Sequence, residues 1–397
     1  MQTTHADSPR FWLLAALGAA LTAVGLAAAH FMEERGHIVT GMDNQVVWGL
    51  PHVFAIFMIV AASGVLNVAS IGSVFGQAAY KTRARLSGLL CLALLAGGLM
   101  VLMLDLGRPE RVIVAATHYN FRSVFAWNVF LYSGMAAIVA IYLWTQFERG
   151  MARWSKPVGV AALVWRFALT TGTGSIFGFL VARQAYQSAL LAPLFIVLSF
   201  GWGLAVFLLV QAAMFAWVGG RVPPELLRRL ARLLGVFVAA ALFLVAVYHL
   251  TNLYYARQSA FSAFILLGRD GGGIHAALFW LGYVLAGSVV PLALLWSPLA
   301  TRAPAVVAAS ALTVLGALAW LFVFIVGGQA FPLDIFPGYT ASSSFGDGAV
   351  QHYLPMLPEW LLGLGGMAAA YLLTIVGVRA LDMLPRDATE GAAAPPP

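Results

Sequence analysis

Ten apolar segments, each long enough to cross a lipid bilayer, constrain this chain more than any other feature. They lie near residues 11–30, 51–75, 86–104, 123–145, 157–181, 189–217, 231–254, 274–297, 305–327 and 358–380. A hydrocarbon core of about 30 Å requires about 20 apolar residues per helix, and lipid offers no partner for an unpaired backbone group. The sequence therefore predicts an all-α integral membrane protein of about ten transmembrane helices.

The composition excludes a water-soluble fold. Of the 397 residues, 61% are hydrophobic and only 9% are charged, whereas roughly 25% of the residues in an ordinary soluble domain are charged. A net charge of +7 would suggest nucleic-acid binding in a soluble protein. Here the Lys and Arg residues lie in short connections between apolar runs, so membrane orientation explains them better.

The distribution of Lys and Arg predicts that orientation. If successive runs alternate in direction, the side that holds both chain ends carries twice as many Lys and Arg residues as the other side. The positive-inside rule then places the N-terminus (1–10) and the C-terminal tail (381–397) in the cytoplasm of a bacterial cell, with a polytopic domain (11–380) in the inner membrane. The tail lacks an apolar face and is expected to be disordered. The first run ends in three alanines, as a signal peptide often does, but its length favours a retained helix.

The connections on the predicted outer side are longer and more polar than those on the inner side. They are rich in Trp, His, Asn, Gln, Asp and Gly and span residues 37–48, 105–123, 183–187 and 327–359. The inner connections are short and basic, as at residues 81–85. We therefore expect function at the outer face.

One acidic residue lies at the outer end of the third run, in the segment Leu-Asp-Leu-Gly-Arg-Pro at 104–109. A carboxylate at membrane depth is costly, so Asp105 is expected to have a partner, and Arg108 follows one turn later. One interpretation is an ion pair at a helix end that Pro109 terminates. The other is a proton-transfer carboxylate beside a quinone headgroup, since a quinone takes up protons as it is reduced.

His118, Tyr119 and Asn120 precede the fourth run, for which Ser123 is the expected N-cap. A quinone site needs donors for two carbonyl oxygens, a titratable group and an aromatic or apolar wall, and these three side chains offer all of them. A belt of Tyr, His and Arg at the membrane interface explains the same residues equally well.

Trp48 and Gln45 precede the second run, and Pro51 suits the first turn of its helix. Trp48 is typical of an interface anchor. Gln45 and the neighbouring Asn44 have no evident structural task. We therefore include Trp48 and Gln45 among the candidates for headgroup binding.

Polar residues also occur within later runs. His249 and Asn252 share one helix face near the outer end of the seventh run, where an interhelical hydrogen bond is favoured over ligand binding. Arg166 in the fifth run is expected to extend its side chain toward the cytoplasmic surface. A proton or water path through Arg166 is the alternative.

Redox cofactors within the chain are not expected. The single cysteine, Cys91, excludes an iron–sulfur cluster held by four cysteines and an internal disulfide, so any cluster must belong to a partner. Apart from His5, the histidines gather near the outer helix ends, which disfavours two stacked haems. One outer haem between His30 and His249 is the alternative, and no other metal site is predicted.

Several motifs together resemble the NrfD/PsrC family, the membrane subunits of polysulfide reductase-like complexes. They are Trp-Gly-Leu-Pro at 48–51, the segment 104–109 followed by Asn120-x-x-Ser123-x-x-x-Trp127, Gly-Gly-Gln-Ala-Phe-Pro at 327–332, Phe-Pro-Gly at 336–338 and Ser-Ser-Ser-Phe-Gly-Asp-Gly at 342–348. Ten predicted helices and the last of these stretches look most like the DsrP and HybB branch. The resemblance covers nearly the whole chain.

The resemblance implies a subunit that interacts with menaquinone or ubiquinone, holds no haem or cluster, and docks on a periplasmic ferredoxin-like iron–sulfur subunit. For a DsrP-like protein, the complex would be the sulfur-metabolising DsrMKJOP assembly with its other membrane, cytochrome and catalytic subunits. The chain would then belong to an oxidoreductase without being catalytic alone. The family's outer quinone pocket makes Asp105, Arg108, His118 and Asn120 pocket or proton-path candidates.

Two other functions remain open. Trp-Gly-Leu occurs at 48–50 and again at 202–204, which hints at an internal repeat of two four-helix bundles plus two extra helices. Together with Gly-rich runs and Pro291, such a repeat is compatible with a secondary transporter. A purely structural membrane anchor that docks partner subunits is the third possibility.

Overall fold

The computed structural model describes residues 8–333 and 348–385. Ten helical spans in this part are long and apolar enough to cross a membrane. They are α1 (Pro9–Arg35), α2 (Leu50–Ser73), α4 (Ala84–Leu104), α6 (Val124–Phe147), α7 (Ser155–Gly178), α8 (Leu191–Trp217), α9 (Pro224–Tyr254), α11 (Gly273–Ala277) continued by η6 (Leu278–Val289) and α12 (Val290–Leu295), α13 (Ala303–Phe322) continued by η8 (Val323–Gly327) and α14 (Gly328–Ala330), and α15 (Leu357–Ala380). The prediction of ten helices is confirmed, and the chain is a multi-pass integral membrane protein.

Some predictions fall outside the described residues. These are the end of the tail from residue 386, the first seven residues, the Phe-Pro-Gly motif at 336–338 and nearly all of the motif at 342–348.

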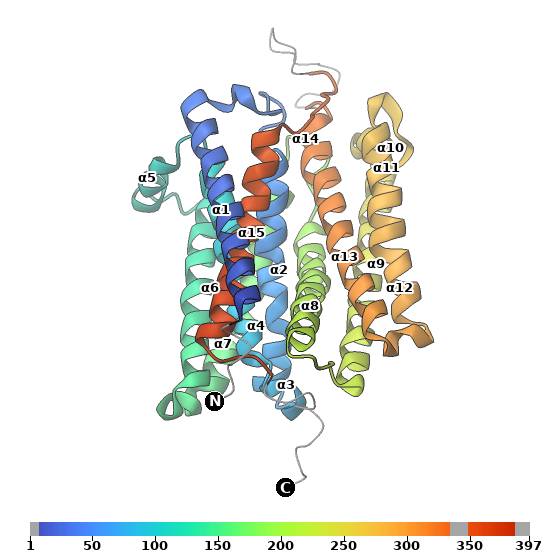
Figure 1. The fold of residues 1–397 in the computed structure, drawn as a ribbon. Coiled ribbons are helices and arrows are strands. Elements are labelled where there is room, and N and C mark those ends of the chain that lie inside the picture. The colour runs from blue at the N-terminus through green and yellow to red at the C-terminus, as the bar shows by residue number, and fades with distance from the viewer. Residues whose placement is uncertain (1–7, 334–347, 386–397) are drawn as a thin grey trace.

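The helices form two units that lie side by side (Figure 1). The first unit consists of α2, α4, α6 and α7, and the second consists of α8, α9, the α11–α12 span and α13. α1 and α15 pack against each other, and α15 also contacts α2 and α4. The predicted architecture of two four-helix bundles plus two extra helices is therefore confirmed.

The seam between the two units is a close contact of two helix backbones. α2 and α8 cross where Gly64 meets Ser199 and Gly203, and a Cβ added to either glycine would overlap the backbone of the other helix. Small residues at such crossings allow membrane helices to approach closely and gain van der Waals contact. α2 also packs against α4, α7 and α15, and nearly all of it is buried.

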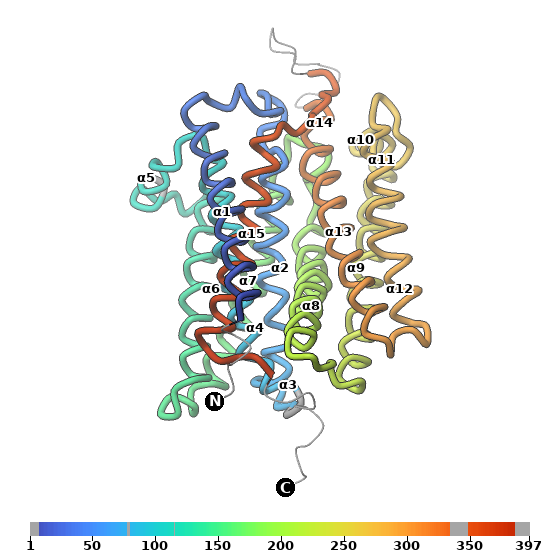
Figure 2. Tube along the Cα trace, viewed as in Figure 1, coloured from blue at the N-terminus to red at the C-terminus, as the bar shows by residue number. Residues whose placement is uncertain are grey.

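The connections differ between the two ends of the molecule, as Figure 2 shows along the chain trace. One end, the loop-rich end (top in Figure 1), carries η2 (His37–Val39), η3 (Pro109–Arg111), α5 (Val112–Thr117), α10 (Ala256–Leu267) and η5 (Arg269–Gly271). At the opposite end, the terminal end, α1 begins and α15 finishes, and the connections contain α3 (Ala78–Lys81), η4 (Arg149–Trp154) and η7 (Pro298–Thr301).

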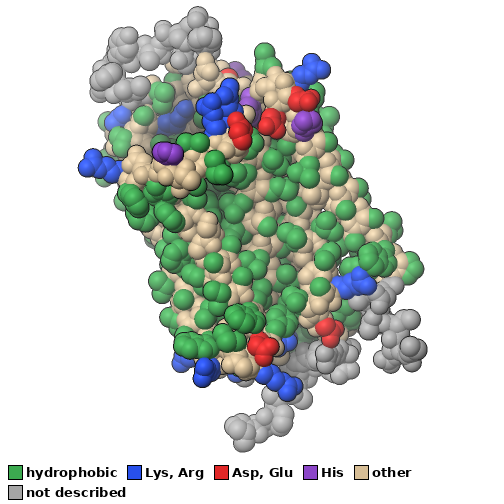
Figure 3. All heavy atoms as spheres, turned by 90° about the vertical axis from the view of Figure 1, so that its left-hand side faces the viewer, with side chains coloured by type: hydrophobic (Ala, Val, Ile, Leu, Met, Phe, Trp, Pro, Cys, Tyr) green, Lys and Arg blue, Asp and Glu red, His purple; other side chains and the backbone are tan. Residues whose placement is uncertain are grey.

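The surface matches a protein embedded in lipid. Figure 3 shows hydrophobic side chains over the middle of one face, while Lys, Arg, Asp, Glu and His gather toward its two ends. Charged side chains are costly in the hydrocarbon layer and favourable at its interfaces.

The predicted helix cap and the predicted helix-starting proline are both found, but the predicted internal repeat is not supported by its motif. Ser123 caps α6 by accepting a hydrogen bond from Ala126 N at 3.4 Å, and Pro51 lies in the first turn of α2. The repeated Trp-Gly-Leu does not mark equivalent positions, because Trp48 precedes α2 whereas Trp202 lies within α8.

Candidate functional site

A histidine and an aspartate meet at the loop-rich end of the first unit. Asp105 directly follows α4, and its Oδ2 lies 2.7 Å from Nδ1 of His52 in the first turn of α2. The Asp105 side chain is fully buried, whereas the His52 side chain is 11% exposed. The two atoms thus lie within ion-pair distance of each other.

Arg108 is not the partner of Asp105, so the first of the two interpretations, an ion pair between them, is wrong. α4 ends at Leu104, and the chain turns at Gly107 with a φ of 23°. Because the helix does not continue, residue 108 is not carried back over Asp105 by the helical repeat. The Arg108 side chain is exposed.

Aromatic side chains form a wall beside the pair. The indole of Trp48 stacks on the His52 imidazole, with ring centroids 5.9 Å apart and an interplanar angle of 27°. Phe177 of α7 and Phe125 of α6 contact the indole at 5.7 and 6.2 Å between centroids. Phe125 is 46% exposed, so the wall extends to the surface of the molecule.

Two further polar atoms lie at this place without a hydrogen-bond partner among the residues that the structure describes. One is Oδ1 of Asp105, and the other is Nδ1 of His37 in η2. The His37 ring covers the turn after Asp105, since its Nε2 lies 3.2 Å from the position that a Cβ would take on Gly107. Both atoms are available to a ligand or to water.

Gln329 of α14 fixes the backbone of Trp48. Its Oε1 accepts hydrogen bonds from Val47 N at 3.1 Å and Trp48 N at 3.0 Å, and its Nε2 donates to Trp48 O at 2.9 Å. Arg183 donates to Gln329 O at 2.9 Å and to Gln45 O at 2.7 Å. Burial lowers the pKa of the Arg183 guanidinium. The Gly-Gly-Gln stretch thus positions the aromatic wall.

Gln45 has a structural task that the sequence did not reveal. Its Nε2 donates to Ala330 O and Ala349 O, each at 3.0 Å, and its Oε1 accepts from Gly348 N at 3.2 Å. The side chain is buried and ties the loop before α2 to the chain after α14. Its amide groups are therefore engaged with the backbone.

Glu359 holds the start of α2 against the start of α15. Its carboxylate is fully buried and accepts hydrogen bonds from Gly41 N and Met356 N, each at 2.8 Å, and from the Tyr353 hydroxyl. That hydroxyl accepts in turn from Leu50 N at 2.7 Å. Burial and the adjacent Glu359 raise the pKa of Tyr353, so it stays protonated.

The residues predicted just before α6 form a local turn. His118 is exposed, with its Nδ1 3.1 Å from the Thr117 hydroxyl. The Tyr119 hydroxyl donates to Ala126 O, and Asn120 Oδ1 accepts from Arg122 N at 3.0 Å. The structure does not bring these side chains into the His52–Asp105 pair.

His249 and Asn252 lie in the second unit, close to the loop-rich end of α9. The His249 ring contacts Phe279 edge to face at 4.9 Å between centroids. His249 Nδ1 and Asn252 Nδ2 are buried and lack a hydrogen-bond partner within residues 8–333 and 348–385, so the predicted interhelical hydrogen bond is not made by these atoms. A haem between His30 and His249 is also wrong, because α1 and α9 lie on opposite sides of the bundle.

Arg166 is buried, contrary to the prediction that it extends to the cytoplasmic surface. It is 4% exposed, and its Nη1 donates to Asn67 Oδ1 of α2 at 2.6 Å. The guanidinium also lies over the Phe200 ring of α8 at 5.5 Å. The side chain stays inside because α2 and α8 both pack against this part of α7.

Comparison with known proteins relates most of the chain to one family. Residues 38–333 match the family described as Polysulphide reductase, NrfD. The Hdr-like menaquinol oxidoreductase integral membrane subunit of Archaeoglobus fulgidus is 29% identical over 97% of this chain and 96% of its own length. A candidate membrane subunit of dimethyl sulfoxide reductase from Halobacterium salinarum is 29% identical over 92% and 90% of the two chains. Protein NrfD of Escherichia coli is 25% identical over 72% and 96%.

Proposed function

Because the chain belongs to the Polysulphide reductase, NrfD family, we propose that it is the quinone-reactive membrane subunit of an oxidoreductase complex. The observation that carries this proposal is the pair of His52 and Asp105, 2.7 Å apart, beside the ring of Trp48. The name of the Archaeoglobus fulgidus relative supports the proposal and favours menaquinol among the quinones.

The donor set fits a quinone headgroup. Such a headgroup is a flat ring with an oxygen at each end, and it exchanges electrons together with protons. Trp48 and Phe125 provide a flat wall that reaches the surface. Asp105 Oδ1 is buried and has no hydrogen-bond partner in the described part of the chain, as expected of an atom that serves a ligand or its proton.

The two side chains divide the proton chemistry between them. His52 binds a quinone oxygen through its second ring nitrogen and exchanges a proton with that oxygen. Asp105 fixes the tautomer and orientation of the ring through Nδ1 and stabilises the imidazolium form. His37, over the turn after Asp105, offers the next position for a proton on its way to the loop-rich end.

Electrons must enter or leave the chain through a partner. Cys91, the only cysteine of the chain, is fully buried, and iron–sulfur clusters of the common types need several cysteine ligands. We therefore place a ferredoxin-like iron–sulfur subunit at the loop-rich end, close to the His52–Asp105 pair. The excess of Lys and Arg at the terminal end supports a periplasmic loop-rich end and cytoplasmic chain ends in a bacterial inner membrane. A DsrP-like place in a sulfur-metabolising complex stays a prediction.

Quinol-linked turnover of the native complex tests this function. We expect Asp105→Asn and His52→Gln each to lower inhibitor-sensitive turnover by about 100-fold, the lower range for loss of a positioned acid or base. His118→Ala is the matched control, since His118 is exposed, and it should retain wild-type turnover. Normal turnover in assembled Asp105→Asn and His52→Gln complexes would leave a structural anchor as the function.

A further inference from the structure

Several polar side chains inside the second unit lack hydrogen bonds. His249 Nδ1 and Ser310 Oγ are buried and have no partner among the residues that the structure describes, and the same holds for Asn252 Nδ2 and Gln211 Oε1. The Tyr283 hydroxyl is also buried and lies beside the Ser288 side chain. Buried polar groups in proteins are nearly always paired, either with protein or with ordered water. A group of such atoms in one unit therefore points to water.

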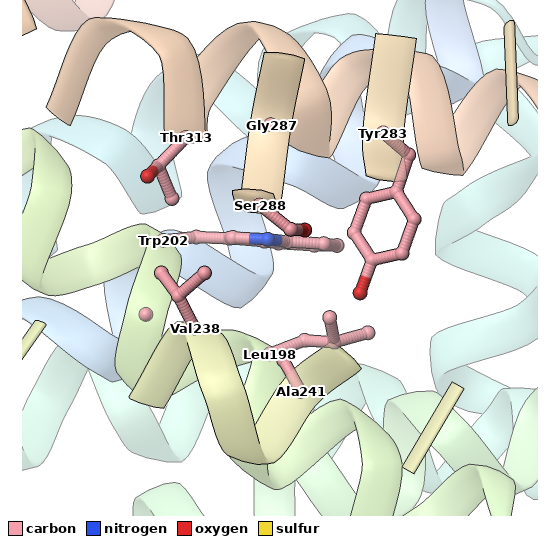
Figure 4. A pocket seen from close by; sticks show the side chains of 9 residues that line it. Leu198, Trp202, Val238, Ala241, Tyr283, Gly287, Ser288 and Thr313 are labelled. Carbon is pink, nitrogen blue, oxygen red and sulfur yellow. The ribbon is translucent and has the colours of Figure 1, made fainter. Parts of the chain in front are cut away.

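Two small cavities lie among the same helices. The first is lined in part by Tyr283, Ser288, Thr313 and Trp202, and Figure 4 shows the Tyr283 hydroxyl pointing into it. The second is lined by His249 and by aromatic rings that include Phe279. Each has room for about one water molecule. Tyr283, Ser288 and Thr313 offer that water polar atoms in the first cavity, and His249 does so in the second.

The helices that line the cavities are irregular. η6 and η8 are π-helical, and they supply Phe279, Tyr283 and Ser288 on one side and Phe324 on the other. A π-helix is rare, and π turns inside α-helices are frequently found at functional sites. The irregular turns and the unpaired polar atoms thus coincide.

The polar side chains follow one another along the axis of the second unit. His249 lies near the loop-rich end of α9, and Tyr283 lies in the middle of its span. Ser310 lies in the first half of α13, which begins at the terminal end. Ser288 and Thr313 border the cavity between these levels. Gln211, in the last third of α8, is closest to the terminal end.

We propose that the second unit holds a chain of internal water molecules that relays protons between His249 and Ser310. Water and hydroxyl groups in such a chain pass a proton by breaking one O–H bond and forming the next, with no net change in any member. The chain runs through α8, α9, η6 and α13, whereas the His52–Asp105 pair belongs to α2 and α4. This path therefore goes beyond the proposed quinone site.

X-ray radiolytic labelling of the native complex tests for the water. Bound water next to a side chain produces hydroxyl radicals on the spot, so we expect Tyr283 to be modified at least fivefold faster than Tyr186. Tyr186 is the matched control, because it is also buried and its hydroxyl donates to Ile325 O at 2.8 Å. Equal, slow modification of both tyrosines would overturn the proposal.

Passive proton flux tests the relay. The native complex is placed in vesicles with an internal pH dye, and a potassium diffusion potential drives protons without any quinol. We expect Tyr283→Phe and Ser310→Ala each to lower the flux at least fivefold, while Tyr371→Phe, on the half-exposed face of α15, leaves it unchanged. Equal flux in all four complexes would show that the water is structural and that no relay exists. Because no quinol is present, this outcome is independent of the His52–Asp105 proposal.

Discussion

The two four-helix units treat their interior polar groups differently. In the first unit, Arg166 donates to Asn67 at 2.6 Å and Ser87 donates to Val65 O at 2.5 Å. Even there, Arg166 Nε, Asn67 Nδ2 and Asn128 Oδ1 lack a hydrogen-bond partner among the described residues. In the second unit, the buried Ser310 hydroxyl has no such bond within the described ranges, and Gln211 Oε1 and His249 Nδ1 also lack one. Both π-helical segments belong to the second unit: η6 lies within the α11–α12 span, and η8 continues α13.

This difference shows two ways to place polar groups in a membrane protein. The first unit consists of regular helices, and it holds His52 and Asp105 at its loop-rich end. The π-helical turns of the second unit border two small cavities. Regular helices pack closely around a fixed pair of side chains, whereas irregular turns leave room for water.

The seam between the units can be broken at Gly203. Its added Cβ would overlap the backbone of α2 at Gly64, so Gly203→Ala should lower the free energy of unfolding by about 3 kcal/mol, the cost of severe overpacking. Gly201→Ala is the matched control, because a Cβ there would lie 3.8 Å from Phe237. Thermal unfolding of the purified subunit in detergent measures both changes. Equal stability of the two variants would mean that the units do not depend on this crossing.

The hydrogen bond between Arg166 and Asn67 inside the first unit can be tested by replacing Asn67. Asn67→Leu leaves the buried Arg166 guanidinium without its 2.6 Å acceptor, and we expect a loss of about 2 kcal/mol, as for a hydrogen bond to a charged group. Replacing Arg166 by Met as well should recover part of this loss, because the unpaired charge is then removed. Chemical denaturation of the single and double variants gives the comparison. A double variant that is less stable than Asn67→Leu would contradict it.

The smallest expected change in stability comes from replacing one buried serine in each unit. Ser87 and Ser310 are both completely buried, but only the Ser87 hydroxyl bonds with protein among the described residues. We expect Ser87→Ala to cost about 1 kcal/mol of unfolding free energy, and Ser310→Ala to cost less than about 0.5 kcal/mol. Thermal unfolding under identical conditions measures both. A larger cost at Ser310 would show that the second unit is also held together by protein hydrogen bonds.

The transmembrane helices could be predicted from the sequence, and so could Asp105 of the His52–Asp105 pair. The length of each apolar run sets a transmembrane helix directly, and Asp105 was expected to need a partner because a carboxylate at membrane depth is costly. The partner itself was missed. A signal was present, since His52 follows Trp48 by four residues at the start of a run.

The rest could not be predicted because neighbouring helices are not encoded in the apolar pattern. Lipid and the protein interior are both apolar, so a membrane helix shows little difference between the side that faces lipid and the side that faces other helices. The sequence alone therefore did not show that Arg166 meets Asn67. It also gave no local sign that Gln329 and Glu359 bind backbone groups about 300 residues away or that η6 and η8 are π-helical.

Glu359 bonds with Gly41 and, through Tyr353, with Leu50. These contacts join the two ends of the chain, so they form only late in its synthesis. The chain enters the membrane from its first span onward, yet the loop that carries Trp48 obtains its final anchors from residues near the last span. A chain that has delivered only nine spans lacks the Glu359 and Tyr353 contacts with Gly41 and Leu50. Insertion of α15 is then the step of assembly that completes the anchors of the loop before α2.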